Sequence, residues 1–112
     1  MSNNDLLIRQ KCEEMIAYGY VALRQFPKFE RHVLAAEMRH AMWEVLRLIV
    51  VCNKRYHKKT TLQDLDAQLD LLRTQVRISK QLGYIDFKKY EYWARLNNEI
   101  GCMIGGWIKA FA

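Results

Sequence analysis

The sequence has few residues that break or bend a helix. Its 112 residues include one proline and five glycines. Strands joined by tight turns need frequent turn residues, because glycine and proline supply the backbone conformations that such turns require. Pro27 and Gly83 are the clearest breaks in the chain. We therefore expect a few long helices rather than a sheet.

The chain also lacks a long apolar run. The longest extends only from Leu48 to Cys52, whereas a membrane-spanning helix needs about 20 apolar residues. Residues Met1 to Asp5 lack the basic and apolar regions of a secretory leader. Cys12, Cys52 and Cys102 are odd in number and widely spaced, which argues against a disulfide framework. We expect a cytoplasmic protein with no membrane partner.

Length and composition indicate a single domain over residues 1–112. Hydrophobic residues make up 51% and charged residues 27% of the chain, values close to those of globular proteins. Eighteen Lys and Arg residues against 12 Asp and Glu give a net charge of +6. A basic surface attracts nucleic acid, acidic proteins or anionic lipid. We do not expect lipid binding, because the apolar faces are needed for the core.

Four segments have apolar residues at the three- and four-residue spacing of a helix face. The expected helices are Asp5 to Gln25, Glu30 to about His57, Thr60 or Thr61 to Leu82, and one that begins at Asp86. Asp5 is the expected N-cap of the first helix, and Thr61 with Asp64 resembles a capping box. Gly83 follows the third helix as a C′ glycine. Short connections favour antiparallel neighbours, so the expected fold is all-α, an antiparallel up-down four-helix bundle.

The same spacing selects the candidate core residues. They are Leu6, Met15, Ile16, Tyr18, Tyr20, Val21 and Leu23 in the first helix; Leu34, Met38, Ala41, Met42, Val45, Ile49 and Cys52 in the second; Leu62, Leu65, Leu69, Leu72 and Val76 in the third; and Trp93, Leu96, Ile100, Met103, Trp107 and Phe111 in the fourth. The third set has the heptad spacing of helices that pack at shallow angles. Gly19 weakens the first helix, because glycine in a helix interior costs about 1 kcal/mol relative to alanine.

Basic residues gather in three places. Arg73, Arg77 and Lys80 form one stripe along the third helix. The other two groups are Lys54, Arg55, Lys58 and Lys59 at the end of the second helix, and Lys88 with Lys89 at the start of the fourth. In an up-down bundle these two groups lie at opposite ends, and we expect the stripe to bridge them. Clustered Lys and Arg bind phosphate backbones with salt-sensitive affinity; the alternative is a solubilising surface.

Aromatic residues are interleaved with this charge. They are Tyr56, Tyr84, Phe87, Tyr90 and Tyr92. Such rings can stack on unpaired bases, but we favour packing at the edge of the core.

Three glycines lie in the fourth apolar segment. Gly101 and Gly105 are one helical turn apart, and Gly106 and Trp107 follow. A smooth stripe of this kind lets another helix approach closely, with the tryptophan as an apolar anchor. The partner helix belongs either to the same bundle or to a second subunit, and the sequence leaves both alternatives open.

No motif for catalysis is present. The chain has no nucleophile elbow, zinc-protease motif or phosphate-binding glycine loop. His32, His40 and His57 lack the spacing of metal ligands. Glu37 and His40 match the Glu-x-x-His of di-iron bundles, but only once, so we expect a solvated pair. We expect no catalytic residues, metal or cofactor; a carboxylate-bridged metalloprotein is the enzymatic alternative.

Four segments resemble a known family. The segment from Phe26 to Leu34 is similar to the Phe-Pro-Lys-x-Glu-Arg-x-x-Leu opening of the second helix in a superfamily of four-helix bundles. That superfamily includes the ribosomal intervening-sequence proteins and the accessory variability determinant (Avd) of diversity-generating retroelements. The segment from Ile100 to Lys109 resembles the Avd ending Gly-x-Met-x-Gly-Gly-Trp-Ile-Lys. The segments Leu72 to Lys80 and Leu82 to Ile85 are also similar.

The resemblance implies a non-enzymatic accessory protein. Avd proteins associate with the reverse transcriptase of the retroelement and bind nucleic acid, template RNA or cDNA, in support of mutagenic cDNA synthesis. A pentameric homo-oligomer is also implied. By resemblance, the binding positions are Arg31, Arg73, Arg77 and Lys109, whereas Lys54, Arg55, Lys58, Lys59 and Lys80 rest on charge clustering alone. The alternative is a structural or interaction module of the wider superfamily with no retroelement role.

Overall fold

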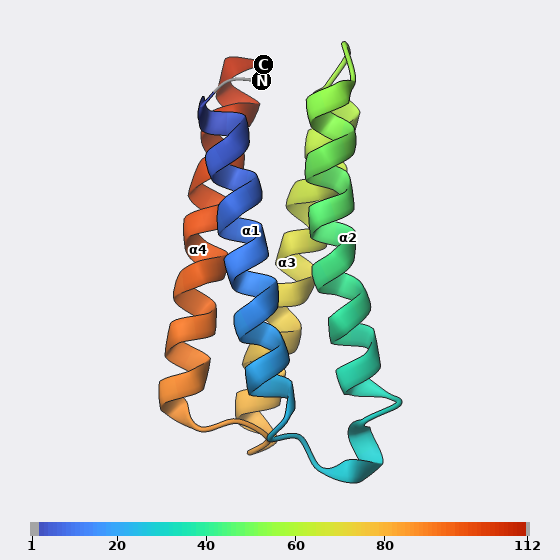
Figure 1. Cartoon of the computed structure of the whole chain (residues 1–112), viewed down its shortest axis with the longest axis vertical. Helices are drawn as coiled ribbons and strands as arrows, with labels where there is room; N and C mark the ends of the chain where they lie inside the picture. The colour runs from blue at the N-terminus through green and yellow to red at the C-terminus, as the bar shows by residue number, and fades with distance from the viewer. Residues whose placement is uncertain (1–2, 112) are drawn as a thin grey trace.

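The computed structural model of the protein describes residues 3–111 as four long helices. They are α1 (Asn3–Leu23), α2 (Leu34–Lys54), α3 (Lys59–Gln81) and α4 (Phe87–Ala110), with a short 3-10 helix, η1 (Lys28–Glu30), before α2. Each helix packs against the next, and α1 also packs against α4 (Figure 1). The expected all-α up-down four-helix bundle is confirmed.

The connections divide between the two ends of the bundle. The loop between α2 and α3 lies at the same end as both ends of the chain, which we call the upper end (Figure 1). The connections from α1 to α2 and from α3 to α4 lie at the lower end. Within residues 3–111, the helices all fall short of the length and apolarity that crossing a membrane requires.

The predicted seam of α3 lies in the centre of the core. Leu62, Leu65, Leu69, Leu72 and Val76 are all buried, as the heptad spacing predicts. In α4, Trp93, Leu96 and Ile100 are also buried, but the next core residue is Ile104 rather than Met103. Met103 and Trp107 are half-buried and Phe111 is exposed. The prediction for the last two turns of α4 is therefore correct in part, because Met103 and Trp107 pack against the core without being fully buried and Phe111 lies outside it.

The predicted apolar face of α1 is partly wrong. Three of its members are exposed: Leu6, Tyr20 and Val21. The side that faces the core instead carries Cys12 and the buried Gly19. Small residues are needed there because Met42 of α2 and Trp93 of α4 fill the adjacent space: a Cβ at position 19 would overlap Met42 Sδ and lie 3.1 Å from Trp93 Cζ2. A close approach of helices explains the glycine that weakened the sequence-based prediction.

Two of the predicted helix ends are confirmed in detail. Gly83 has φ of +78°, the left-handed conformation that glycine adopts without steric cost. The amide of Tyr84 donates to the carbonyl of Ser79 at 2.9 Å and that of Gly83 to Lys80 at 3.0 Å, which is the complete Schellman motif. At the start of α4, the Asp86 side chain accepts from the Lys89 amide at 2.8 Å.

The other predicted ends are wrong. Asp5 is not an N-cap, because α1 begins at Asn3. Helix α2 begins at Leu34 rather than Glu30 and ends at Lys54 rather than His57, since the chain after Pro27 forms η1 and a turn first. Helix α3 begins at Lys59, and Thr61 lies inside it with its hydroxyl accepting from Arg55. The threonine hydroxyl thus binds a side chain instead of capping the helix.

Candidate nucleic-acid interface

The basic stripe of α3 lies along its boundary with α4. Arg73 is half-buried, and its Nη2 donates to Asn98 Oδ1 of α4 at 2.7 Å. A Cβ at Gly101 would lie 3.0 Å from the same Nη2, so this glycine makes room for the guanidinium. Arg77 is exposed one turn further along. The helix pairing therefore fixes the position of the first arginine and leaves the second to solvent.

Lys80 continues the stripe to the lower end. Its ammonium nitrogen lies 5.1 Å from the ring centre of Phe87 and 4.9 Å from that of Tyr90. Both distances are within the range of a cation–π interaction. Lys80 and Phe87 are exposed, and Tyr90 is half-buried. The stripe therefore ends beside two aromatic rings of α4.

The expected bridge between the ends of the bundle is wrong. The basic stripe covers only the part of α3 from its centre to the lower end, because Asp66 and Asp70 occupy the preceding turns. Both carboxylates are exposed. They separate the stripe from the basic residues at the upper end, so the two basic surfaces are distinct.

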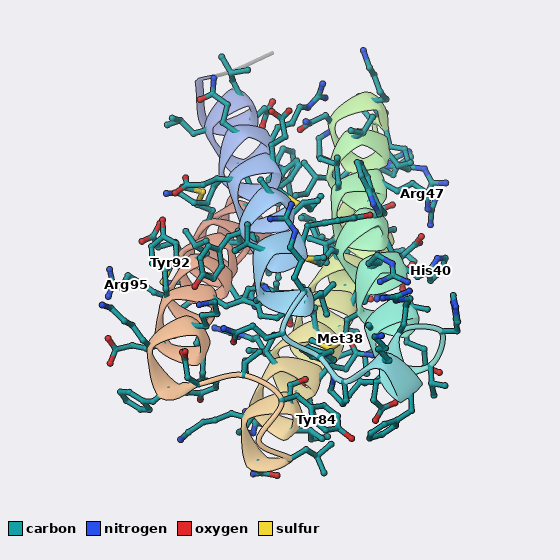
Figure 2. All side chains as sticks on the ribbon, turned by 60° about the horizontal axis from the view of Figure 1, so that its bottom comes forward. Met38, His40, Arg47, Tyr84, Tyr92 and Arg95 are labelled. Atoms are coloured by element: carbon teal, nitrogen blue, oxygen red, sulfur yellow. The ribbon has the colours of Figure 1, made fainter. Side chains whose placement is uncertain are left out.

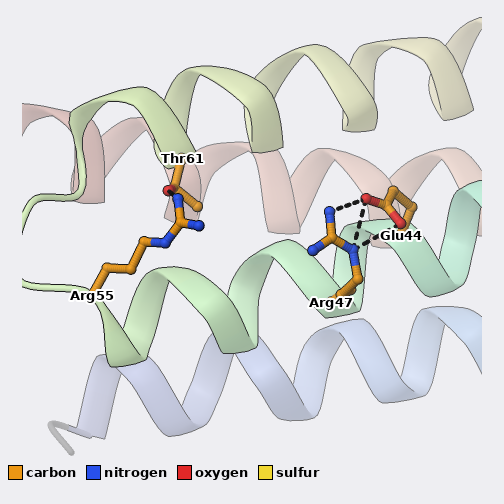
Figure 3. A network of polar contacts seen from close by, with 4 residues as sticks. All are labelled: Glu44, Arg47, Arg55 and Thr61. Carbon is orange, nitrogen blue, oxygen red and sulfur yellow. Dashed lines mark hydrogen bonds and ion pairs between the residues drawn. The ribbon is translucent and has the colours of Figure 1, made fainter.

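Two of the four residues in the upper basic cluster donate hydrogen bonds within the fold. The cluster consists of Lys54, Arg55, Lys58 and Lys59. Lys58 Nζ donates to the carbonyls of Cys52 and Arg55, each at 2.6 Å, and so caps the C-terminus of α2. The Arg55 guanidinium donates to Thr61 Oγ1 at 2.9 Å across the loop (Figure 3). Lys54 and Lys59 are fully available, since both are exposed and have no partner in the described part of the chain.

The remaining predicted cations lie at opposite ends. Lys109 is exposed in the last turn of α4, at the upper end. Arg31 is exposed in the turn between η1 and α2 at the lower end, where its carbonyl accepts from Arg39 at 2.9 Å. The nine predicted binding residues thus do not form one surface.

None of the nine predicted cations pairs with a carboxylate within residues 3–111. The ion pairs in this range involve other cations: Lys11 with Glu14 and Glu99, Arg47 with Glu44, and Arg95 with Glu91. Arg47 lies beside Glu44 on α2 (Figure 3). No carboxylate in this range therefore compensates the charge of the predicted binding residues, although Arg55, Lys58 and Arg73 donate hydrogen bonds within the fold.

The interleaved aromatic residues divide into two groups. Tyr84 packs at the core edge as favoured: it stacks near Phe26 and donates to Glu30 Oε2 at 2.7 Å. That hydrogen bond raises the pKa of Tyr84. Tyr92 also packs, because its ring meets that of Tyr18 of α1 edge-on at 4.5 Å between ring centres, and Arg95 lies beside it (Figure 2). Phe87 is 60% exposed, too much for a packing role alone.

A polar hollow between α3 and α4 was not predicted. It has a volume of about 280 Å³, and its walls include Arg73, Arg77, Tyr90, Asn97 and Asn98. Asn97 is fully buried, and neither its amide nitrogen nor its amide oxygen has a hydrogen-bond partner in the region described. In the sequence, the only sign of this hollow was the polar Asn97 directly after the apolar Leu96.

The glycines of α4 have different surroundings. Gly101 packs under Arg73, whereas no atom of residues 3–111, apart from the chain neighbours and the backbone of the same helix, lies within 4 Å of a Cβ placed at Gly105 or Gly106. These two glycines therefore do not serve close packing inside the bundle. Trp107 is half-buried beside them in the wall of a second cavity, of about 540 Å³, at the upper end.

Glu37 and His40 are both exposed on α2. His40 projects outward from that helix (Figure 2). In the described range, no three His, Cys, Asp or Glu side chains gather closely enough to hold a metal ion.

The sequence matches the model of one protein family. The bAvd-like family model covers residues 6–111, which is nearly the whole chain. No curated protein matches the sequence.

Proposed function

Because this chain belongs to the bAvd-like family, the bacterial Avd accessory proteins of diversity-generating retroelements, we propose that it binds nucleic acid and associates with the reverse transcriptase of its retroelement. Proteins of this family are accessory and non-catalytic. The nucleic acid is template RNA or cDNA, and binding supports mutagenic cDNA synthesis. The stripe of Arg73, Arg77 and Lys80 is the principal binding surface.

One structural observation supports the proposal in addition to family membership. The three cations of the stripe lie on one face and have no carboxylate partner within residues 3–111. Cations that the fold pairs, such as Arg47, already have their charge compensated. Binding of phosphates releases the counterions that otherwise surround a nucleic acid. Unpaired cations therefore contribute more to the free energy of binding than paired cations do.

The proposal is tested with the double variant Arg73→Glu/Arg77→Glu. We expect it to lose binding to RNA and to co-purify less with the co-expressed reverse transcriptase. The matched control is Arg24→Glu/Arg47→Glu, which changes the net charge equally but on α2 and in the turn after α1. Equal loss in both variants would show that only net charge matters, and no loss in either would contradict the proposal.

We also propose that the chain forms a homo-oligomer, the pentamer that the family resemblance implies. The open surface at Gly105 and Gly106 supports this, because a helix of another subunit can approach there without steric conflict. Light scattering of the purified protein measures the mass. We expect a ring-sized oligomer, and we expect Gly105→Leu to lower the mass while helix content is unchanged. A monomeric wild-type protein would contradict this proposal.

A further inference from the structure

The hollow between α3 and α4 joins the basic stripe to the aromatic rings of α4. Arg73 and Arg77 form one wall, and Tyr90 and the amides Asn97 and Asn98 form the other. Its volume of about 280 Å³ is just below the range of roughly 300–1,000 Å³ of pockets for drug-sized ligands. The hollow is thus of a size for one flat polar group rather than for a duplex.

Asn97 is the residue in the wall of this hollow whose buried amide has no hydrogen-bond partner within residues 3–111. Its side chain is fully buried in the wall of the hollow, and both amide atoms lack partners among the described residues. Buried polar groups in native proteins nearly always have a partner, because leaving one unpaired costs free energy. An amide offers both donors and an acceptor, and the edge of a nucleobase offers both as well. The unpaired amide suits a base, and because both amide atoms are buried, a base reaches them only when side chains that line the hollow move aside.

The rings beside the hollow supply a surface for stacking. Phe87 is 60% exposed, and Lys80 lies over both Phe87 and Tyr90. Aromatic side chains stack on bases of any sequence, provided that the base faces are not already covered by base pairing and stacking. A duplex hides these faces, and a strand of acidic protein has none. The combination of rings, amide and cations therefore favours a single strand.

We propose that the α3/α4 hollow receives one unpaired base of a single-stranded nucleic acid. The adjacent phosphates bind the stripe of Arg73, Arg77 and Lys80. Asp70 stands at the rim of the hollow on the side toward the upper end, and its negative charge directs the strand toward the lower end. The inference rests on the proposed nucleic-acid binding and adds the class of ligand, namely a single strand rather than a duplex.

The test compares three labelled RNAs with equal numbers of phosphates by fluorescence anisotropy. They are a single strand without secondary structure, an abasic strand and a duplex. Stacking and base contacts predict that the single strand binds roughly five- to a hundred-fold more tightly than the abasic strand. Equal binding of these two RNAs would overturn the inference.

Variants locate the base-dependent part of the affinity. Phe87→Ala and Asn97→Leu are expected to bring single-strand affinity close to that of the abasic strand and to leave duplex affinity unchanged. The control is Tyr56→Ala, since Tyr56 is 89% exposed but lies in the loop at the upper end. Phe87 is exposed at the first residue of α4, so its replacement preserves the fold even where Asn97→Leu does not.

The outcomes separate this inference from the function on which it rests. If none of the RNAs binds, the proposed nucleic-acid binding fails, and the inference fails with it. If all three bind equally, nucleic-acid binding stands and the single-strand inference is overturned. If the variants lose the reverse transcriptase but keep the single strand, the hollow is a protein contact and the inference is likewise overturned.

Discussion

Replacement of Gly19 tests the packing of the bundle most sharply. Helix propensity alone predicts that Gly19→Ala stabilises α1 by about 1 kcal/mol. The structure predicts the opposite, because the new Cβ would overlap Met42 Sδ and lie 2.8 Å from Met42 Cε. Met42 is fully buried, so its thioether must repack among core side chains rather than move into solvent. Overpacking of this kind costs about 1–3 kcal/mol, and we expect a net loss of about 1 kcal/mol.

The assay is urea unfolding followed by circular dichroism, with Gly106→Ala as the matched control. Gly106 is also in a helix, but in the region described its added Cβ has no atom within 4 Å apart from its chain neighbours and the backbone of its own helix. Within one protomer only propensity acts there, so we expect a gain of up to about 1 kcal/mol when light scattering shows the same mass for the wild type and both variants. The two variants should therefore differ by about 2 kcal/mol. If Gly19→Ala stabilises the protein as much as Gly106→Ala does, the predicted close approach of α1 to its neighbours is refuted.

Three smaller predictions concern helix ends and a buried thiol. Gly83→Ala should lower the unfolding free energy by about 1–2 kcal/mol, because φ is +78° there; an unchanged urea midpoint would contradict this. Asp86→Ala should cost about 1 kcal/mol by removing the N-cap of α4, while Asp86→Asn, which keeps an acceptor, should cost less. Burial raises the pKa of Cys12 from 9.0 to about 12. The unfolded state therefore ionises first, so stability falls as pH rises from 9.0 toward 12; Cys12→Ala should flatten this fall, and an equally steep fall in the variant would exclude the thiol as its cause.

The sequence predicted those parts of the fold that depend on neighbouring residues. The positions of Gly83 and Asp86 were correct because a C′ glycine and an aspartate N-cap act on amides within the same turn. The seam of α3 was correct because five leucine and valine residues at heptad spacing leave one choice of face.

The errors arise where a distant side chain decides the outcome. Thr61 was assigned as a cap, but Arg55 binds its hydroxyl. The core side of α1 depends on the space that Met42 and Trp93 leave at Gly19, and neither residue is close to it in the sequence.

The sequence predicted the charge of the candidate site but not its shape. Arg73, Arg77 and Lys80 were recognised as one stripe from their spacing alone. The separation of this stripe from the upper basic cluster by Asp66 and Asp70 became evident only when the whole of α3 was positioned in the bundle. The burial of Asn97 beside the stripe depends on the pairing of α3 with α4. Side-chain composition gave no sign that an unpaired amide would lie in that wall.

The central claim is that the α3 stripe binds the phosphates of a nucleic acid, and salt dependence tests it most directly. The measurement is the affinity for a single-stranded RNA across a series of salt concentrations, for the wild type and for Arg73→Gln/Arg77→Gln. Each phosphate contact to a single strand contributes about 0.7 to the slope of log affinity against log salt. The account predicts a slope that is smaller by about 1.4 in the double variant. An unchanged slope in a folded double variant would contradict it.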